Sequence, residues 1–110
     1  MSHGVIDLEV GEVSDMEARV FAHYRPTTGE PIVLRGMLRG PYCERAHTLP
    51  AEYPFRDLGQ EGVAEAVVPD PCLWSEALPH LYHAEVAALR GVEVVAEFRG
   101  PIGLRRISQK

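Results

Sequence analysis

Two cysteines and a histidine are the residues of this sequence best suited to bind a metal or to form a crosslink. Cys43 precedes His47 by four positions, and Cys72 follows a rigid Asp-Pro pair. Thiolate and imidazole groups are usual ligands of structural zinc, but such sites more often use CxxC pairs, which are absent here. The two cysteines could also form one disulfide or remain separate buried thiols, and we favour the separate thiols. We therefore predict no metal and no cofactor.

Four carboxylates near the middle of the chain are the candidates for acid–base chemistry. Their spacing fixes no two of them at one point, so we interpret them as solvated side chains. The sequence also contains no GxSxG, no HExxH and no glycine-rich phosphate loop followed by a helix. No catalytic residue is predicted. The four are Glu65, Asp70, Glu76 and Glu85.

Aromatic residues offer a third kind of chemistry, stacking on sugar rings. Tyr42, Tyr53 and Trp74 could form such a platform together with the loop of residues 41–62. However, Trp74 is the only tryptophan and lies in VVPDPCLWSEALPHLY, residues 67–82, among prolines at 69, 71 and 79. Prolines remove backbone donors and exclude an interior helix or a central strand. We favour Trp74 as a structural anchor at a crossing between sheets, with Tyr82 beginning a core strand.

The elements around these residues are predicted to be short β-strands, because apolar and polar residues alternate with a period of two. No stretch shows a sustained helical period with caps. The pattern indicates an all-β, immunoglobulin-like antiparallel two-sheet β-sandwich of seven to eight strands. The expected strands are residues 5–10, 17–24, 32–39, 47–49, 63–68, 82–89, 92–98 and 102–107.

Glycine and proline positions refine this prediction. The glycines of LRGMLRG, residues 34–40, indicate a bulge or the close approach of another backbone. Arg90-Gly91 is predicted to join the clearest hairpin, and Arg99-Gly100-Pro101 to break the pairing after it. In the long irregular stretch of residues 41–62, we expect Phe55 and Leu58 to fold back onto the core.

Composition limits the classes of function. The chain has 110 residues, of which 45% are hydrophobic and 25% charged, so we expect a single globular domain spanning residues 1–110. A formal net charge of −5 argues against a nucleic-acid or acidic-membrane partner. The first ten residues show no signal-peptide pattern, and no apolar run is long enough to span a bilayer. The compartment is not determined by the sequence, with the cytoplasm as the default.

A family resemblance rests on two motifs. LWSEALPHLY, residues 73–82, resembles the LWSPExPxLY signature of glycoside hydrolase family 2, the β-galactosidase, β-glucuronidase and β-mannosidase group. In that family the signature lies in an immunoglobulin-like β-sandwich domain. IGLRRI, residues 102–107, is similar to the strand that closes this sandwich and leads to the catalytic barrel. One departure is Glu76-Ala77, where the family usually has Pro-Glu.

The resemblance implies the role of an accessory domain, which orients other domains and is not itself the enzyme. The family's catalytic glutamates lie in the barrel, and the sequence given ends at Lys110, where that barrel would begin. Trp74, Tyr82 and Arg105 would then anchor a contact with a neighbouring domain or subunit of a glycosidase-like protein; a homodimer is also open. The alternative hypothesis is a carbohydrate-binding module that uses Trp74 and the loop of residues 41–62.

Overall fold

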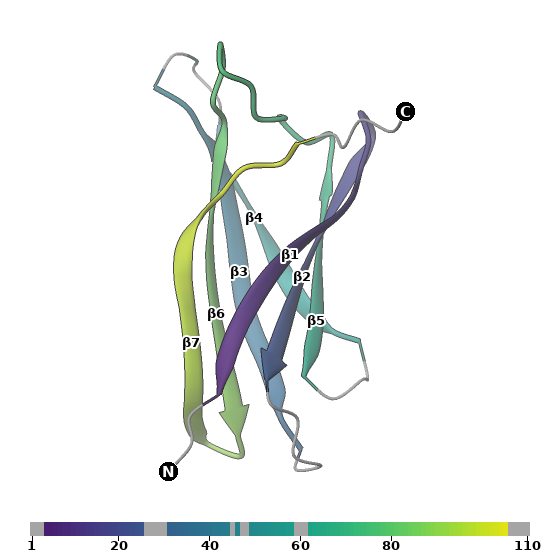
Figure 1. Cartoon of the computed structure of the whole chain (residues 1–110). Coiled ribbons are helices and arrows are strands. Elements are labelled where there is room, and N and C mark those ends of the chain that lie inside the picture. Colours follow the sequence, from purple (N-terminus) through teal and green to yellow (C-terminus); the bar gives the residue numbers. More distant parts are fainter. Residues whose placement is uncertain (1–3, 26–30, 45, 47–48, 59–61, 106–110) are drawn as a thin grey trace.

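The computed structural model describes residues 4–25, 31–44, 46, 49–58 and 62–105, and these residues form seven β-strands (Figure 1). The described part of the chain contains no helix that could cross a membrane. The strands are β1 (Val5–Val13), β2 (Glu17–Arg25), β3 (Val33–Tyr42), β4 (Ala51–Asp57), β5 (Val63–Pro69), β6 (Leu81–Arg90) and β7 (Glu93–Ile102).

All strand pairs are antiparallel, and the order β1-β2-β5-β4-β3-β6-β7 forms one continuous sheet. Strand β4 joins the two halves, because it pairs with β3 over most of its length and with β5 only at Arg56 and Asp57. The outermost strands β1 and β7 lie against each other, so the sheet nearly closes on itself. The prediction of an all-β, antiparallel fold is confirmed at this level.

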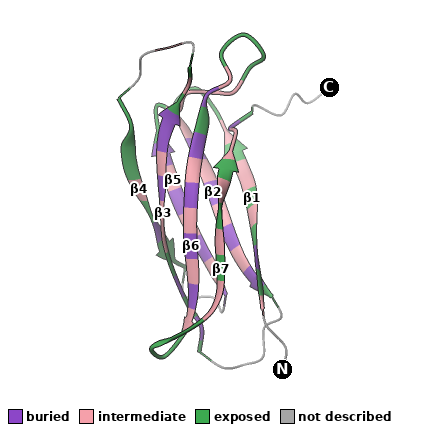
Figure 2. Cartoon of the chain, turned by 90° about the vertical axis from the view of Figure 1, so that its left-hand side faces the viewer, coloured by how far each residue is buried: buried purple, intermediate pink, exposed green. Residues whose placement is uncertain are grey.

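The core is formed by the inward side chains of the curled sheet. Buried and partly buried residues alternate along β2, β5 and β6, as the period-two pattern predicts (Figure 2). Many of the fully buried residues are alanines, which let facing strands approach closely, and a few large side chains fill the remaining space. These large side chains are Val20, Leu34, Leu38, Val68, Tyr82 and Leu104.

The expected break at Arg99-Gly100-Pro101 is wrong. Strand β7 continues through these residues to Ile102, and Pro101 pairs with His83 of β6. Since β7 is the last strand of the sheet, a proline without an N–H group can be accommodated on its free edge. The strand expected at residues 102–107 is also wrong over 103–105, which lie outside any strand; residues 106 and 107 lie outside the described part.

The irregular stretch differs from the prediction in a similar way. Strand β4 begins at Ala51 and includes Pro54, whereas an edge strand was expected at residues 47–49. Leu49 is not in a strand, and residues 47 and 48 lie outside the described part. Pro54 is tolerated because β4 pairs with β5 only beyond it, at Arg56 and Asp57. Phe55 is buried as expected, but Leu58 is exposed.

Gly36 confirms the predicted close approach of two backbones. A Cβ atom built on Gly36 would lie 2.2 Å from the carbonyl oxygen of Glu85 and 2.8 Å from the Cα atom of Val86. Only a residue without a side chain fits between β3 and β6 here. Gly40 lies at the irregular pairing between Arg39 and Tyr42, where a bulge was the other expectation.

We expect Gly36→Ala to lower the free energy of unfolding by about 3 kcal/mol, because the new methyl group must push backbone apart. Gly100→Ala is the matched control, since its Cβ would meet nothing closer than 3.4 Å. Denaturant melts of both variants measure the difference. Equal stability of the two variants would contradict the close approach at Gly36.

Candidate functional site

The connection between β5 and β6 (residues 70–80) lies at one end of the molecule (Figure 1), and Trp74 is part of it. The backbone N–H of Trp74 donates a hydrogen bond to the carbonyl oxygen of Leu104 at 2.7 Å, and its backbone also forms an isolated bridge with Pro79. The indole packs on Gly103, where a Cβ atom would lie 3.1 Å from indole Cδ1. The chain that follows β7 therefore closes over the half-buried tryptophan.

Arg105 completes this arrangement. Its guanidinium carbon lies 4.0 Å from the centroid of the Trp74 ring, which is the geometry of a cation–π contact. Two of the three predicted anchor residues are thus brought together by the structure. We call Trp74, Pro79, Gly103, Leu104 and Arg105 the Trp74 cluster.

Tyr82, the third predicted anchor, lies at the start of β6 with only 1% of its surface exposed. Its hydroxyl oxygen accepts a hydrogen bond from the backbone N–H of Cys72 at 3.0 Å. Its ring lies 6.5 Å from that of Tyr53, with the two planes tilted by 57°. Burial raises the pKa of the Tyr82 phenol, and the hydrogen bond from Cys72 acts in the opposite direction. Tyr82 therefore ties the β5–β6 connection to the core.

The three candidates for sugar stacking lie in different surroundings. Tyr53 is opposite the buried Leu38 and packs against the core, whereas Tyr42, opposite Leu81, is 47% exposed. Trp74 is covered in part by Arg105. The described geometry thus supplies no shared platform of these three rings.

The metal and disulfide hypotheses concern Cys43, Cys72 and His47. Both cysteines are half-buried free thiols. His47 lies outside the described residues. In the described part of the chain, no three His, Cys, Asp or Glu side chains group together. The zinc hypothesis stays untested at His47.

The candidate carboxylates are spread over the sheet. Glu65 on β5 forms an ion pair with Arg19 at 3.1 Å, and the hydrogen bonds of Arg19 to Glu17 and then to Glu65 raise the pKa of the arginine. Glu85 on β6 lies 3.6 Å from Arg39. Asp70 and Glu76 are exposed in the β5–β6 connection. This arrangement suits surface ion pairing and brings no two of these carboxylates into an acid–base pair.

Two features of this end were missed by the sequence analysis. Tyr42, Leu78 and Leu81 are exposed apolar residues in or paired with the segment around Pro79, and we call them the apolar rim. The apolar residues of ALPHLY, residues 77–82, were the signal available in the sequence. Whether each of them is exposed depends on strand register. The second feature is His80, which is buried and whose Nδ1 atom has no hydrogen-bond partner in the described structure.

We expect Tyr82→Phe to lower the free energy of unfolding by about 1–2 kcal/mol at neutral pH, because Cys72 N–H loses its acceptor. The raised pKa adds a pH dependence. The stability that the buried neutral phenol contributes is complete below pH about 10, the unfolded value, and is lost as pH rises through the higher folded value. The free energy of unfolding should therefore decline less steeply with rising pH for Tyr82→Phe than for the unmodified chain, as measured by melts at alkaline pH. Identical slopes for both proteins would contradict this account.

Arg105→Ala should lower stability by about 0.5–1 kcal/mol, the range of an exposed cation–π contact. The emission of Trp74, the only tryptophan, should change at the same time because the ring loses its cover. Arg56→Ala is the control, since Arg56 is an exposed arginine on β4. Fluorescence spectra and melts check both effects. An unchanged emission spectrum for Arg105→Ala would show that the contact is absent in solution.

Comparison with known proteins gives similarity at the level of fold. No family model and no curated protein matches the chain. The Ruminococcus gnavus β-glucuronidase, solved with uronic isofagomine, matches with a TM-score of 0.56 and 24% identity, covering 97% of this chain and 16% of that enzyme. A β-glycosidase from Bacteroides vulgatus matches with a TM-score of 0.54 and 17% identity, covering 92% and 13%. The chain thus resembles in fold a small part of these glycosidases, as its Trp74 motif predicts.

Proposed function

We propose that this chain is a non-catalytic β-sandwich domain that contacts a neighbouring domain or subunit of a glycosidase-like protein through the end that carries Trp74. The observation that carries the proposal is the Trp74 cluster. Trp74 is held by a 2.7 Å hydrogen bond to Leu104 and covered by Arg105 at 4.0 Å. An aromatic ring bound in this way by its own chain acts first as a structural anchor.

The order of strand pairing supports the immunoglobulin-like part of the proposal. In immunoglobulin constant domains, strands ABED form one sheet and strands CFG the other. Numbered along the chain, β1-β2-β5-β4 and β3-β6-β7 follow this order. The two groups are linked through the β3–β4 pairing. We infer two layers that share β4, within one domain spanning residues 1–110.

The apolar rim supports a protein surface as the partner. Tyr42, Leu78 and Leu81 are 47%, 42% and 37% exposed; Leu78 precedes Pro79 of the Trp74 cluster in the chain, and Leu81 pairs with Tyr42. Aromatic residues and arginine are enriched in the centres of protein interfaces. A flat apolar partner surface could cover the rim and leave the contact between Trp74 and Arg105 intact. A sugar that stacked on Trp74 would compete with Arg105 for the ring.

The proposal that the chain is non-catalytic rests on the ion pairing of its carboxylates and on the small share of the matched glycosidase that the chain covers. Glu65 and Glu85 are engaged by Arg19 and Arg39. A retaining glycosidase needs two carboxyl groups about 5 Å apart on a rigid scaffold. The chain covers only 16% of the matched β-glucuronidase, so that enzyme's activity is not assigned to this chain.

We expect Trp74→Ala to lower the free energy of unfolding by about 2–4 kcal/mol, somewhat below the loss for a fully buried tryptophan because the ring is half-buried. Tyr42→Ala, an exposed aromatic at the same end, should change stability by less than about 1 kcal/mol. We also expect that neither the unmodified chain nor either variant binds to a glycan array. Denaturant melts and array binding are measured on the same preparations.

The carbohydrate-binding alternative predicts the opposite combination. Under it, Trp74→Ala would keep the midpoint of unfolding and would lose an affinity for glycans that the unmodified chain shows. That result would overturn the proposed role of Trp74 and would favour a binding module.

A further inference from the structure

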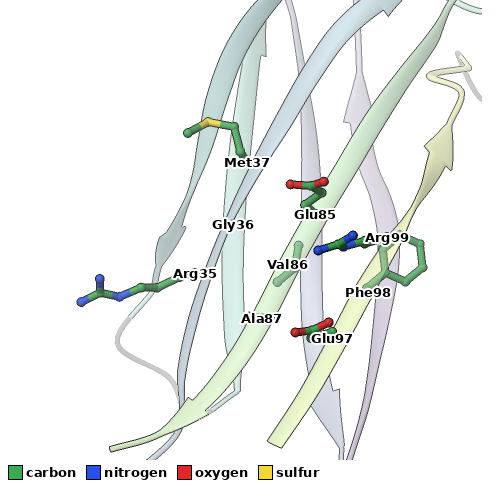
Figure 3. Close-up of a pocket in the computed structure, with 9 residues that line it drawn as sticks. All are labelled: Arg35, Gly36, Met37, Glu85, Val86, Ala87, Glu97, Phe98 and Arg99. Atoms are coloured by element: carbon green, nitrogen blue, oxygen red, sulfur yellow. The ribbon is translucent and has the colours of Figure 1, made fainter. Parts of the chain in front are cut away.

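A second surface, separate from the Trp74 cluster, lies on the outer face of β3, β6 and β7. It surrounds a shallow hollow of about 390 Å³ (Figure 3). We call it the Ala87 face. Its side chains are Arg35, Met37, Glu85, Ala87, Glu97 and Arg99.

Strand register explains the hollow. Arg35 of β3 pairs with Ala87 of β6, and Ala87 pairs with Glu97 of β7. The short alanine forms the floor, and one positive and one negative side chain flank it. Because neighbouring strands are about 4.8 Å apart, the two charged residues begin roughly 10 Å from each other.

The two flanking charges have no ion-pair partner among the residues that the structure describes. Both Arg35 and Glu97 are exposed, and neither forms an ion pair in the described structure. Figure 3 shows the Arg35 side chain extending from β3 away from β6. The Glu97 side chain lies beside β7, on the side of β6. By contrast, Arg39 on the same face already contacts Glu52 at 2.7 Å and Glu85 at 3.6 Å.

This charge pattern is complementary to itself. A two-fold axis that runs along β6 through Ala87 places β3 of one copy over β7 of the other. Arg35 of each copy then faces Glu97 of the other, which makes two equivalent ion pairs. Ala87 faces Ala87, and these small side chains allow the two sheets to approach. An axis perpendicular to the strands would instead place Arg35 over Arg35.

We propose that the Ala87 face binds a second copy of this chain in a symmetric, face-to-face dimer. Like charges meet only at Glu85, which lies on the axis strand. Each Glu85 is accompanied by Arg39 at 3.6 Å and by Arg99, its cross-strand neighbour. These arginines offset the repulsion between the two glutamates.

The size of the face sets the strength of the dimer. Three strands pairing over about nine residues form a surface of roughly 15 by 30 Å. Its burial in both copies removes about 900 Å² from water, at the small end of specific interfaces. We therefore expect a dissociation constant of roughly tens to hundreds of micromolar, which weakens further as salt screens the ion pairs.

Charge-reversal variants of the full chain test the proposal by sedimentation equilibrium. Arg35→Glu and Glu97→Arg each place like charges opposite each other twice in the dimer. Each should raise the dissociation constant by about tenfold or more. The double variant Arg35→Glu/Glu97→Arg should return to within about threefold of the unmodified chain. Matching thermal melts confirm that all variants are folded.

Mixing the two single variants is the decisive arm. A copy with Arg35→Glu carries two acidic groups at these positions, and a copy with Glu97→Arg carries two basic groups. The mixture should form a heterodimer although both copies remain net negative, from a starting charge of −5. Replacing Glu97→Arg in the mixture with Glu12→Arg, which has the same net charge but a change on β1, should give a heterodimer at least about tenfold weaker, because one of its two ion pairs becomes a pair of acidic groups.

Three results would overturn the proposal. They are an unmodified chain that stays monomeric at concentrations up to roughly 1 mM, a dimer that the single variants do not weaken, and a heterodimer of the two single variants that is no tighter than the heterodimer formed with Glu12→Arg. The second result would assign the dimer to another surface, such as the apolar rim. The first result, a chain that stays monomeric, would show that the Ala87 face does not bind a second copy.

Discussion

The structure depends on how the connection between β5 and β6 is fixed, because this segment carries Trp74 and lies outside the strands of the sheet. Pro71 and Pro79 have no N–H group, and the connection forms no strand of the sheet, so single hydrogen bonds fix its position. Three of its backbone donors attach it to other parts of the chain: Cys72 N–H binds the hydroxyl of Tyr82, Trp74 N–H binds the carbonyl of Leu104, and Asp70 N–H binds the carbonyl of Met16. The first bond ties the connection to β6, and the second ties it to the chain after β7.

Much of the fold could be predicted because alternation of apolar and polar residues reports directly on a sheet with one buried face. Two of the errors fall at prolines. Pro101 was interpreted as the end of a strand, yet it lies within β7, and Pro54 lies within β4. A proline is excluded from a strand only where its nitrogen must donate to a neighbour. Which edge is free follows from the pairing order of the whole sheet, and the local sequence does not contain that order.

The candidate site was predictable in part. The motif around Trp74 identified the segment and two of its partners, since the resemblance implied that Arg105 and Tyr82 belong to the same end. The contact of Arg105 with the indole depends on how the chain leaves β7. The Ala87 face was not predictable, because Arg35 and Glu97 are distant in sequence and come to flank Ala87 only through the register of three strands. Alternation tells which face a residue occupies but not which residue lies beside it.

The central claim is that Trp74 and its segment belong to the structural framework of the domain. Amide hydrogen exchange measures this most directly, because protection reports the free energy needed to open each hydrogen bond. The account predicts that the amides of Cys72 and Trp74 exchange as slowly as those of β6, while Val92 in the exposed β6–β7 turn exchanges rapidly. Exchange of Cys72 and Trp74 at the rate of Val92 would contradict the account, since the segment would then open independently of the sheet.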